Sequence, residues 1–396
     1  MGDILFLAHR TPFPPDRGDR IRSWNLLRYL ALRRPVHLVA FGDGAPVPPE
    51  LSAICASVRL VPHRIGQAAA VSRSLWSGQP ASVEFFKDPN FQAAVDDALN
   101  RSAIRTIYAF SSQMAAYLPP QSDARILIDF VDMDSQKFDA LAGISHFPTS
   151  IAWKREARLL RAFERTAARR ADICLFVSAS EAIDFEEAHR GSAGRIAIVP
   201  NGVDLSYFRP LSPATGSRDL LFVGQMDYRP NVDAVAGFAR DVMPILRHHN
   251  LGAQLKIVGR APTAAVRALA KADDIDVVGE VANVRPWLQQ AAVVVVPLRV
   301  ARGIQNKVLE AMACARPVVA SSAAVAGLHL THGHEVMIAD TPNDQARAVG
   351  QLLKHPERAA ELGAAARQRV EQGFSWAASY AALEPLISAS ITSEAA

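Results

Sequence analysis

Short apolar runs rich in Val, Ile, Leu and Phe recur along the chain, and a longer segment with apolar residues at helical spacing follows most of them. Such runs are expected where helices cover both faces of a parallel sheet, because neither face of the strand then meets water. The alternation of strand and helix predicts an α/β protein with doubly wound sheets. The predicted strands are residues 4–8, 36–41, 58–62, 106–110, 125–131, 173–178, 196–200, 220–224, 255–259, 275–279, 293–297 and 317–321.

The chain is long enough for two such sheets. Its 396 residues exceed what one ordinary hydrophobic core holds, so two domains are expected. We place the boundary within residues 201–220, where the strand pattern gives way to Pro, Gly, Ser and Asp. This predicts one domain over residues 1–205 and a second over residues 206–375. Ligands of such sheets bind outside the carboxyl ends of the strands, and a cleft between the two domains is the expected site.

Composition and charge exclude several classes of protein. Hydrophobic residues make up 49% of the chain and charged residues 21%, which excludes disorder over most of its length. The 43 basic and 39 acidic residues give a net charge of +4, too small to indicate binding to nucleic acid. Cys55, Cys174 and Cys314 are widely spaced and form no CxxC pair, which favours a cytoplasmic location.

The sequence shows no targeting or membrane-spanning pattern. The apolar run near the N-terminus has the length of a strand and lacks the basic residues of a signal peptide. No apolar run approaches the about 18 residues that a membrane-spanning helix needs. We therefore expect contact with a membrane, if there is any, to be peripheral.

Charged residues stand within residues 301–321, a segment otherwise suited to a buried sheet. Gly303 lets the loop turn tightly, so that the first N–H groups of the following helix face a ligand, and such helix ends bind phosphate. Lys307 adds a positive charge in the first turn, and Glu310 lies one turn later on the same face, where its carboxylate accepts two hydroxyl hydrogens. Phosphate together with a vicinal diol indicates a nucleotide. The alternative is a Lys–Glu pair on a solvated helix face.

The stretch VVVVPLRVARGIQNKVLEAMACARPVVAS, residues 293–321, resembles the donor-nucleotide site of retaining GT-B glycosyltransferases, particularly glycosyltransferase family 4. Other segments similar to that family, in the same order, are residues 9–31, 129–138, 198–210, 277–291 and 374–386. The first two of these look like the sugar transferases of exosortase-type exopolysaccharide loci. The resemblance implies a GT-B fold, in which two Rossmann-like domains face a cleft. It also implies an N-terminal acceptor domain, a C-terminal donor domain, and a closing helix over residues 376–396 that crosses back to the N-terminal domain.

The resemblance assigns roles to residues of the donor site. Glu310 matches the second glutamate of the family's E-x7-E motif, which binds the ribose hydroxyls, and Arg302 occupies the position of the first glutamate. The residues that match the family's diphosphate-binding arginine and lysine are uncharged here, so Lys307, Arg302 and Arg229 are predicted to supply positive charge instead. The predicted donor-binding residues are Glu310, Gly303, Ile304, Gln305, Gly224, Arg229 and Gly18.

The N-terminal domain is predicted to bind the acceptor. The family's usual histidine before an aspartate is replaced by Val131 before Asp132. The predicted catalytic residues are Lys307, Arg302 and Asp132, and the predicted acceptor-binding residues are Asp16, Asp19, Arg20 and Asp134. Alternatives without function stay open: a proline-rich turn around Gly18, surface charges beside it, and helix N-caps at Asp132 and Asp134. The aspartates are too few for a metal site, and no metal or other cofactor is expected.

Residues 153–170 show a strong helical pattern with basic residues on one face. These residues are Lys154, Arg158, Arg161, Arg165 and Arg169. A solvated helix face explains them without any function. The functional alternative is attraction to anionic lipid or to a lipid-linked phosphate acceptor, which would place the protein at the inner face of the cytoplasmic membrane.

Together these patterns predict a retaining glycosyltransferase. It would move a sugar from a nucleotide-diphosphate sugar to a saccharide or lipid-linked saccharide, in the synthesis of exopolysaccharide or another cell-surface glycan. One alternative is another GT-B enzyme such as a sugar-nucleotide epimerase, which needs acid and base carboxylates. A second alternative is a sugar-nucleotide-binding protein without turnover, since Arg302 replaces a glutamate that contacts the donor.

Overall fold

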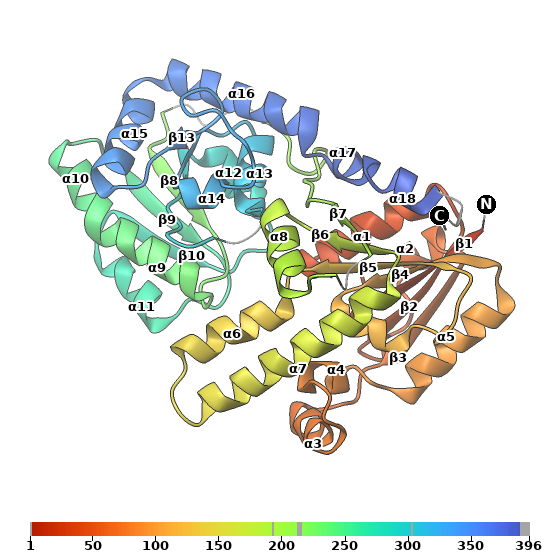
Figure 1. Ribbon diagram of the computed structural model, residues 1–396. Coiled ribbons are helices and arrows are strands. Elements are labelled where there is room, and N and C mark those ends of the chain that lie inside the picture. Colours follow the sequence, from red (N-terminus) through yellow and green to blue (C-terminus); the bar gives the residue numbers. More distant parts are fainter. Residues whose placement is uncertain (1, 192–193, 212–215, 302–303, 389–396) are drawn as a thin grey trace. The chain divides into compact units, whose positions relative to one another are not determined.

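The computed structural model describes residues 2–191, 194–211, 216–301 and 304–388 (Figure 1). The chain forms two compact units, one of residues 1–200 with 380–396 and one of residues 201–379. Each unit is built on one parallel sheet, of seven strands in the first and six in the second. The predicted α/β class with doubly wound sheets is confirmed.

The sheet of the first unit has the strand order β3-β2-β1-β4-β5-β6-β7. The order therefore reverses between β1 and β4, and the carboxyl ends of these two strands form the edge where α/β proteins bind ligands. The strands are β1 (Asp3–Ala8), β2 (Val36–Gly42), β3 (Ser57–Pro62), β4 (Ile104–Phe110), β5 (Arg125–Val131), β6 (Ile173–Phe176) and β7 (Arg195–Ile198). The helices are α1 (Gly18–Ala31), α2 (Pro49–Ile54), α3 (Gln67–Ser77), α4 (Ala81–Phe85), α5 (Pro89–Arg101), η1 (Ser112–Tyr117), α6 (Asp134–Ile144), α7 (Thr149–Arg170), α8 (Ala179–Ala188) and α18 (Glu384–Ser388).

The sheet of the second unit has the order β10-β9-β8-β11-β12-β13, with its reversal between β8 and β11. The strands are β8 (Asp219–Val223), β9 (Gln254–Val258), β10 (Ile275–Gly279), β11 (Val293–Val296), β12 (Val318–Ala320) and β13 (Met337–Ile338). The helices are α9 (Arg229–Gly237), the π-helical turn η2 (Phe238–Val242), α10 (Met243–His248), α11 (Ala264–Arg267), η3 (Ala268–Lys271), α12 (Arg285–Gln290), α13 (Asn306–Ala313), α14 (Ser322–Val325), α15 (Pro342–Lys354) and α16 (Pro356–Gly373).

The apolar runs fill the cores as the pattern predicts. All four valines of β11 are buried, as are all four residues of β6, so both faces of these strands lack contact with water. All twelve predicted strands are present within one or two residues of their expected ends. Among the strands of the described residues, β13 alone, with two residues, was not predicted.

The end of the described chain returns to the first unit. Helix α17 (Trp376–Ala381) carries Tyr380, which is fully buried and donates a hydrogen bond to the backbone oxygen of Arg22 at 3.0 Å. The Arg22 guanidinium in turn pairs with buried Asp129 on β5, which also accepts a hydrogen bond from the Tyr108 hydroxyl at 2.9 Å. These buried partners satisfy one another, so the cluster joins α1, β4, β5 and α17. Residues 389–396 of the predicted closing helix lie outside the described residues.

Two glutamates of α7 face the protein interior. Glu156 accepts hydrogen bonds from the backbone nitrogens of Ala81 and Ser82, at 2.9 and 2.8 Å, and so binds the first turn of α4. Glu164 does the same for α6, through the backbone nitrogen of Ser135 at 2.9 Å and its hydroxyl at 2.6 Å. The acidic residues of α7 are thus used in helix contacts, and its outward face remains basic.

Candidate functional site

Lys307 lies in the first turn of α13, directly after the loop that leaves β11. Its Nζ donates a hydrogen bond to Oδ1 of Asn231 on α9 at 2.6 Å and lies 4.7 Å from the centroid of the Phe222 ring on β8. The ammonium therefore sits between the carboxyl end of β8 and the start of α13. This is the point where the strand order of the second sheet reverses, the usual ligand-binding edge of such a sheet.

Two glycines leave this edge free of side chains. Gly259, with φ of +154°, follows β9, and a Cβ placed there would lie 1.6 Å from the backbone oxygen of Gly224. A Cβ on Gly224, which follows β8, would lie 3.0 Å from Nζ of Lys307 and 2.8 Å from Nδ2 of Asn231. Position 259 therefore requires glycine, because a side chain there would clash with the backbone of Gly224, and a side chain at position 224 would crowd Asn231 and Lys307.

Lys307 and Glu310 occupy the same face of α13, and burial shifts both. It lowers the pKa of Lys307 from its usual 10.5 to about 8, a shift that the negative charge of Glu310 opposes. It raises the pKa of Glu310 from its usual 4.5 to about 7, a shift that Lys307 opposes. Within the described residues Lys307 donates its hydrogen bond to Asn231 and both groups are buried, so the solvated Lys–Glu pair considered above is not what the structure shows. Burial disfavours the charged forms of both groups. An anion beside Lys307 and hydroxyl groups beside Glu310 would stabilise these charged forms.

The remaining predicted donor residues have different surroundings. Arg302 and Gly303 lie outside the described residues. Ile304 packs against the core of the second unit, and Gln305 is the N-cap residue of α13. Arg229 begins α9, where its side chain is 72% exposed and pairs with Asp233 one turn later at 3.6 Å. The structure therefore brings Gly224 to Lys307 but shows no contact between Arg229 and that group.

Asn231 was not anticipated from the sequence. It is buried on α9, and its amide bridges Lys307 and the backbone oxygen of Gln225, to which Nδ2 donates at 2.9 Å. Gln225 also accepts a hydrogen bond from the Arg260 guanidinium at 2.8 Å. The available signal was a lone polar residue on the inward face of a helix that follows a strand. Its partner, 76 residues away, was not evident.

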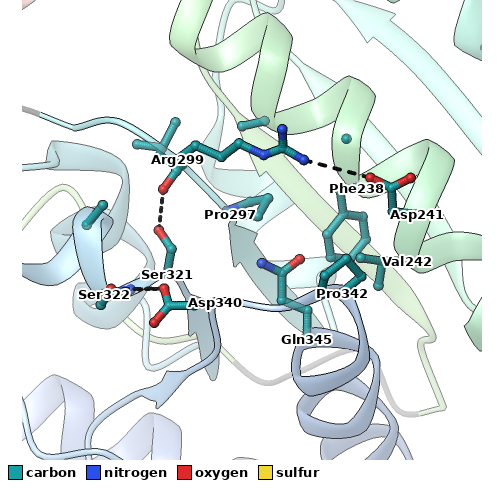
Figure 2. A pocket seen from close by; sticks show the side chains of 14 residues that line it. Phe238, Asp241, Val242, Pro297, Arg299, Ser321, Ser322, Asp340, Pro342 and Gln345 are labelled. Carbon is teal, nitrogen blue, oxygen red and sulfur yellow. Dashed lines mark hydrogen bonds and ion pairs between the residues drawn. The ribbon is translucent and has the colours of Figure 1, made fainter.

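A separate cavity of about 340 Å³ opens in the second unit beyond the carboxyl ends of β11 and β12 (Figure 2). Arg299 reaches toward Asp241 on the π-helical turn at 3.8 Å, and Ser322 donates to Asp340 at 2.8 Å through its backbone nitrogen. Gln345 of α15 also lines the cavity. The lining includes neither Lys307 nor Glu310, so this cavity is distinct from the group around Asn231.

In the first unit, the residues after β1 form a charged network. Asp19 accepts from Arg10 at 2.6 Å and lies 3.3 Å from Nε2 of His9, whose Nδ1 lies 3.5 Å from the backbone oxygen of Phe110. Burial alone would raise the pKa of Asp19, but the hydrogen bonds from His9 and Arg10 outweigh it and hold that pKa well below its usual value. Asp19 therefore fixes the loop after β1.

The other predicted residues after β1, in the loop and in the first turn of α1, are more open. Asp16 and Arg20 pair with each other one turn apart at 3.2 Å near the surface. Gly18 is the first residue of α1, and nothing lies within 4 Å of the position that its Cβ would take. The structure thus separates Asp16 and Arg20 from Asp19, which binds His9 and Arg10 instead.

The carboxyl ends of β4 and β5 hold a second polar group in the first unit. Asp134 is the first residue of α6 and accepts from Nε2 of Gln113 at 2.8 Å and from the Ser112 hydroxyl at 3.2 Å. Burial raises its pKa. The N-cap of α6 is Met133, without a side-chain cap, so neither Asp132 nor Asp134 is the N-cap considered above. Asp132 is exposed.

Two non-glycine residues at this edge have positive φ angles. Val131, which replaces the expected histidine, has φ of 64°, and Ser111 at the end of β4 has φ of 82°. A β-branched residue rarely adopts this conformation, and such strain gathers at functional sites. Ser111 Oγ is buried and makes no hydrogen bond within the part of the chain that the structure describes. The described residues include no group of three or more side chains suited to hold a metal ion, and no helix long and apolar enough to cross a bilayer.

Two glycosyltransferase family models match parts of the chain. Residues 217–355 match the family model described as glycosyl transferases group 1, and residues 138–207 match the model of glycosyltransferase family 4. The first match contains the Lys307 group, and the second contains all of α7. The resemblance expected from the sequence, and with it the glycosyltransferase class of the matched domains, is confirmed.

Individual relatives cover part of the chain. It is 31% identical over 242 residues to alpha-maltose-1-phosphate synthase of Mycolicibacterium smegmatis, a match that covers 54% of this chain and 62% of the relative. It is 27% identical over 240 residues to glycogen synthase of Mycobacterium tuberculosis, covering 56% of this chain and 55% of the relative. The chain thus spans little more than half the length of these curated relatives.

Solved structures match along nearly the whole chain. Sucrose-phosphate synthase from Thermosynechococcus elongatus aligns with a TM-score of 0.70 at 19% identity, covering 98% of each chain. Anabaena HepE, in complex with UDP and glucose, aligns with a TM-score of 0.68 at 14% identity, covering 98% of this chain and 100% of that chain. At such identities the likeness concerns the fold, and it confirms the predicted GT-B architecture of two Rossmann-like units.

Proposed function

This chain is a relative of the group 1 and family 4 glycosyltransferases, and we propose that it transfers a sugar from a nucleotide-diphosphate sugar to a saccharide or lipid-linked saccharide. The observation that carries the proposal is the desolvated Lys307, held by Asn231 at the strand reversal of the second sheet with Glu310 on the same helix face. The proposed role is the synthesis of exopolysaccharide or another cell-surface glycan.

Lys307 is proposed to stabilise the leaving diphosphate. Negative charge grows on the diphosphate as its bond to the sugar breaks, so a fixed positive charge there favours the transition state over the ground state. The first N–H groups of α13 add partial positive charge at the same place. Arg302, four residues before the start of α13, is proposed on sequence grounds to add a further charge.

Glu310 is proposed to accept hydrogen bonds from the ribose hydroxyls. A carboxylate offers two oxygens to a vicinal diol, and hydrogen bonds to its charged form would lower the pKa that burial has raised to about 7. Ribose contacts are alike in ground and transition states, so this residue serves affinity more than turnover. The UDP in the complex with HepE, a structural neighbour, supports a nucleoside diphosphate as the ligand class.

The first unit is proposed to bind the acceptor at the carboxyl ends of β1, β4 and β5. Asp132 and Asp134 follow β5. Asp16 lies in the loop after β1, and Gly18, Asp19 and Arg20 form the first turn of α1. We propose that the reaction retains the anomeric configuration and that the leaving phosphate takes the proton of the acceptor hydroxyl. This scheme needs no protein base and no metal ion.

The cell compartment is also a proposal. Cys55, Cys174 and Cys314 are free thiols, which supports a reducing cytoplasm. A lipid-linked acceptor would place the enzyme at the inner face of the membrane.

The test is acceptor-dependent release of nucleoside diphosphate. Nucleotide sugars are first screened for thermal stabilisation of the full chain, and the best donor is then incubated with saccharide and lipid-linked acceptors. Release that requires an acceptor, with the sugar recovered on it, supports the proposal. Conversion of the donor without acceptor indicates the epimerase alternative, and stabilisation without conversion indicates a binding protein. Either result overturns the proposal.

A further inference from the structure

We propose that a surface of the first unit, built from α3 and α7, docks onto an anionic lipid bilayer. The docking surface is defined by an apolar part and a basic part. Its residues are Val71, Leu75 and Trp76 of α3 and Ile151, Lys154, Arg158 and Arg165 of α7. The inference goes beyond the proposed function, because it concerns neither the donor group nor the chemistry.

Helix α3 exposes almost all of its surface. Only Ala70 and Ser74 of its eleven residues are buried. Trp76 is 92% exposed, Leu75 67% and Val71 52%. Neighbouring large apolar side chains are seldom this exposed to water on a soluble protein. Such an exposed apolar patch indicates a binding surface. The apolar part of the docking surface thus lies at the outer side of α3.

Helix α7 supplies the basic part. Lys154, Arg158 and Arg165 are exposed at helical spacing, and Ile151 on the same face is 57% exposed. The two glutamates of α7 point inward to α4 and α6, as described above. The outward face of α7 therefore carries positive charge that no acidic residue of the same helix offsets.

The two parts are joined directly. Arg155 of α7 donates from its guanidinium to the hydroxyl and the backbone oxygen of Ser74 on α3, at 2.8 and 2.9 Å. Glu156, the next residue, holds the first turn of α4, which follows α3 in the chain. Figure 1 shows α3 and α4 beside α7. These contacts hold α3 against α7, so the apolar part and the basic part of the docking surface lie on adjacent helices.

The positive charge of the docking surface indicates an anionic partner. Residues 62–83 and 140–155, which include α3 and the start of α7, contain no Asp or Glu. A second copy of the same surface would repel it through like charge, and a neutral protein would leave the arginines without partners. An anionic bilayer satisfies both parts, since Lys and Arg bind its headgroups while tryptophan and leucine enter the interface between headgroups and acyl chains.

The experiment is co-sedimentation of the full chain with vesicles at low salt. One set contains phosphatidylcholine with phosphatidylglycerol, and the other contains phosphatidylcholine alone. The chain should bind the anionic vesicles, release as salt is raised, and bind neutral vesicles far less. Leu75→Ser with Trp76→Ser, and separately Arg158→Glu with Arg165→Glu, should each weaken binding about tenfold or more.

Controls separate docking from misfolding and from nonspecific effects. Leu32→Ser replaces a leucine of the same unit that is 82% exposed but lies outside the docking surface, and Arg59→Glu does the same for an exposed arginine. Both variants should bind vesicles like the unchanged protein. Thermal unfolding of every variant checks its fold. Vesicle binding needs no donor and no acceptor, so its outcome is independent of the proposed transferase activity.

Three results would overturn the inference. The first is failure of the unchanged protein to bind anionic vesicles at low salt. The second is equal binding by the Leu75 and Trp76 double variant and by the Leu32 control. The third is a dimer in sedimentation velocity that the double variant abolishes, which would assign the docking surface to self-association.

Discussion

The affinity for a nucleoside diphosphate should fall as the pH rises above about 8, because Lys307 then loses its proton. Burial lowers the pKa of this lysine from 10.5 to about 8 in the protein without ligand. Among the described residues its ammonium contacts uncharged groups, the amide oxygen of Asn231 at 2.6 Å and the Phe222 ring, whose centroid is 4.7 Å away. A diphosphate beside it would favour the charged form and raise the pKa again, so binding above about pH 8 takes up a proton.

The size of the effect follows from the shift. The fall from 10.5 to about 8 corresponds to roughly 3 kcal/mol that disfavours the ammonium before the ligand arrives. Where the free lysine is neutral and the bound lysine is charged, the dissociation constant rises by up to about tenfold for each pH unit. Between about pH 8 and about pH 9.5 the affinity should therefore fall about tenfold or more, with uptake of close to one proton. This range lies above the pKa of Glu310, which is about 7.

Titration calorimetry measures both quantities. UDP and GDP are titrated into the full chain across this pH range, in two buffers with different ionisation enthalpies, so that the heat reports proton uptake. The matched control is Lys307→Arg, whose guanidinium stays protonated and should bind with little dependence on pH. A flat pH profile for the unchanged protein, or the same slope in both proteins, would refute the role of Lys307.

Three further substitutions test neighbouring parts of the account. Because burial raises the pKa of Glu310 to about 7, above its usual 4.5, its contribution to stability is present below about pH 4.5 and lost as the pH rises through 7. Glu310→Gln should thus raise the free energy of unfolding in urea by about 1 to 3 kcal/mol at pH 8 and leave it unchanged at acid pH. The same substitution should weaken nucleotide binding. Equal stability of the two proteins at pH 8 would argue against a buried carboxylate. Asn231→Asp places a carboxylate at the 2.6 Å contact and should hold the Lys307 ammonium in an ion pair, weakening diphosphate binding about tenfold; unchanged affinity in calorimetry would contradict this. Glu156→Ala removes the acceptor for the first turn of α4 and should lower the free energy of unfolding by about 2 to 3 kcal/mol, whereas Glu186→Ala on an exposed face should not; equal losses would contradict the assigned contacts.

The strands could be predicted because their signal is local. A run such as 293–297 is apolar at every position, and only a strand covered on both faces suits it. The ends were less certain, since the apolar pattern does not specify where ladder hydrogen bonds stop. Residues 173–178 were predicted as a strand, for example, and β6 ends at Phe176. Strand β13 has two residues, too few to show any period.

The residues of the candidate site likewise differ in whether local sequence could predict them. Lys307 and Glu310 lie three residues apart on one helix, so their shared face follows from helical geometry alone. Asn231 reaches Lys307 only because β8 and β11 are neighbours at the strand reversal, a fact of topology that spacing does not contain. Contacts between residues far apart in the sequence, such as this one, are the ones that the sequence did not predict.

Local sequence patterns also failed to predict contacts in the first unit. Asp132 and Asp134 looked like helix caps, but Met133 takes that place after Val131 adopts φ of 64° at an irregularity in the pairing of β5 with β6. The inward direction of Glu156 likewise depends on α4, more than seventy residues earlier in the chain, with a sequence separation of 75 to Ala81. A helical pattern predicts which face is buried but not the partner that makes a buried charge tolerable.

The donor nucleotide is proposed to bind the second unit between the carboxyl end of β8 and the start of α13. This placement can be checked by hydrogen–deuterium exchange of the full chain, with and without a saturating nucleoside diphosphate. Residues 222–231 and 304–310 should exchange more slowly with the ligand bound, and Lys307→Met should lose that protection. Protection confined to the first unit, or to the cavity around Arg299 and Gln345, would contradict this placement.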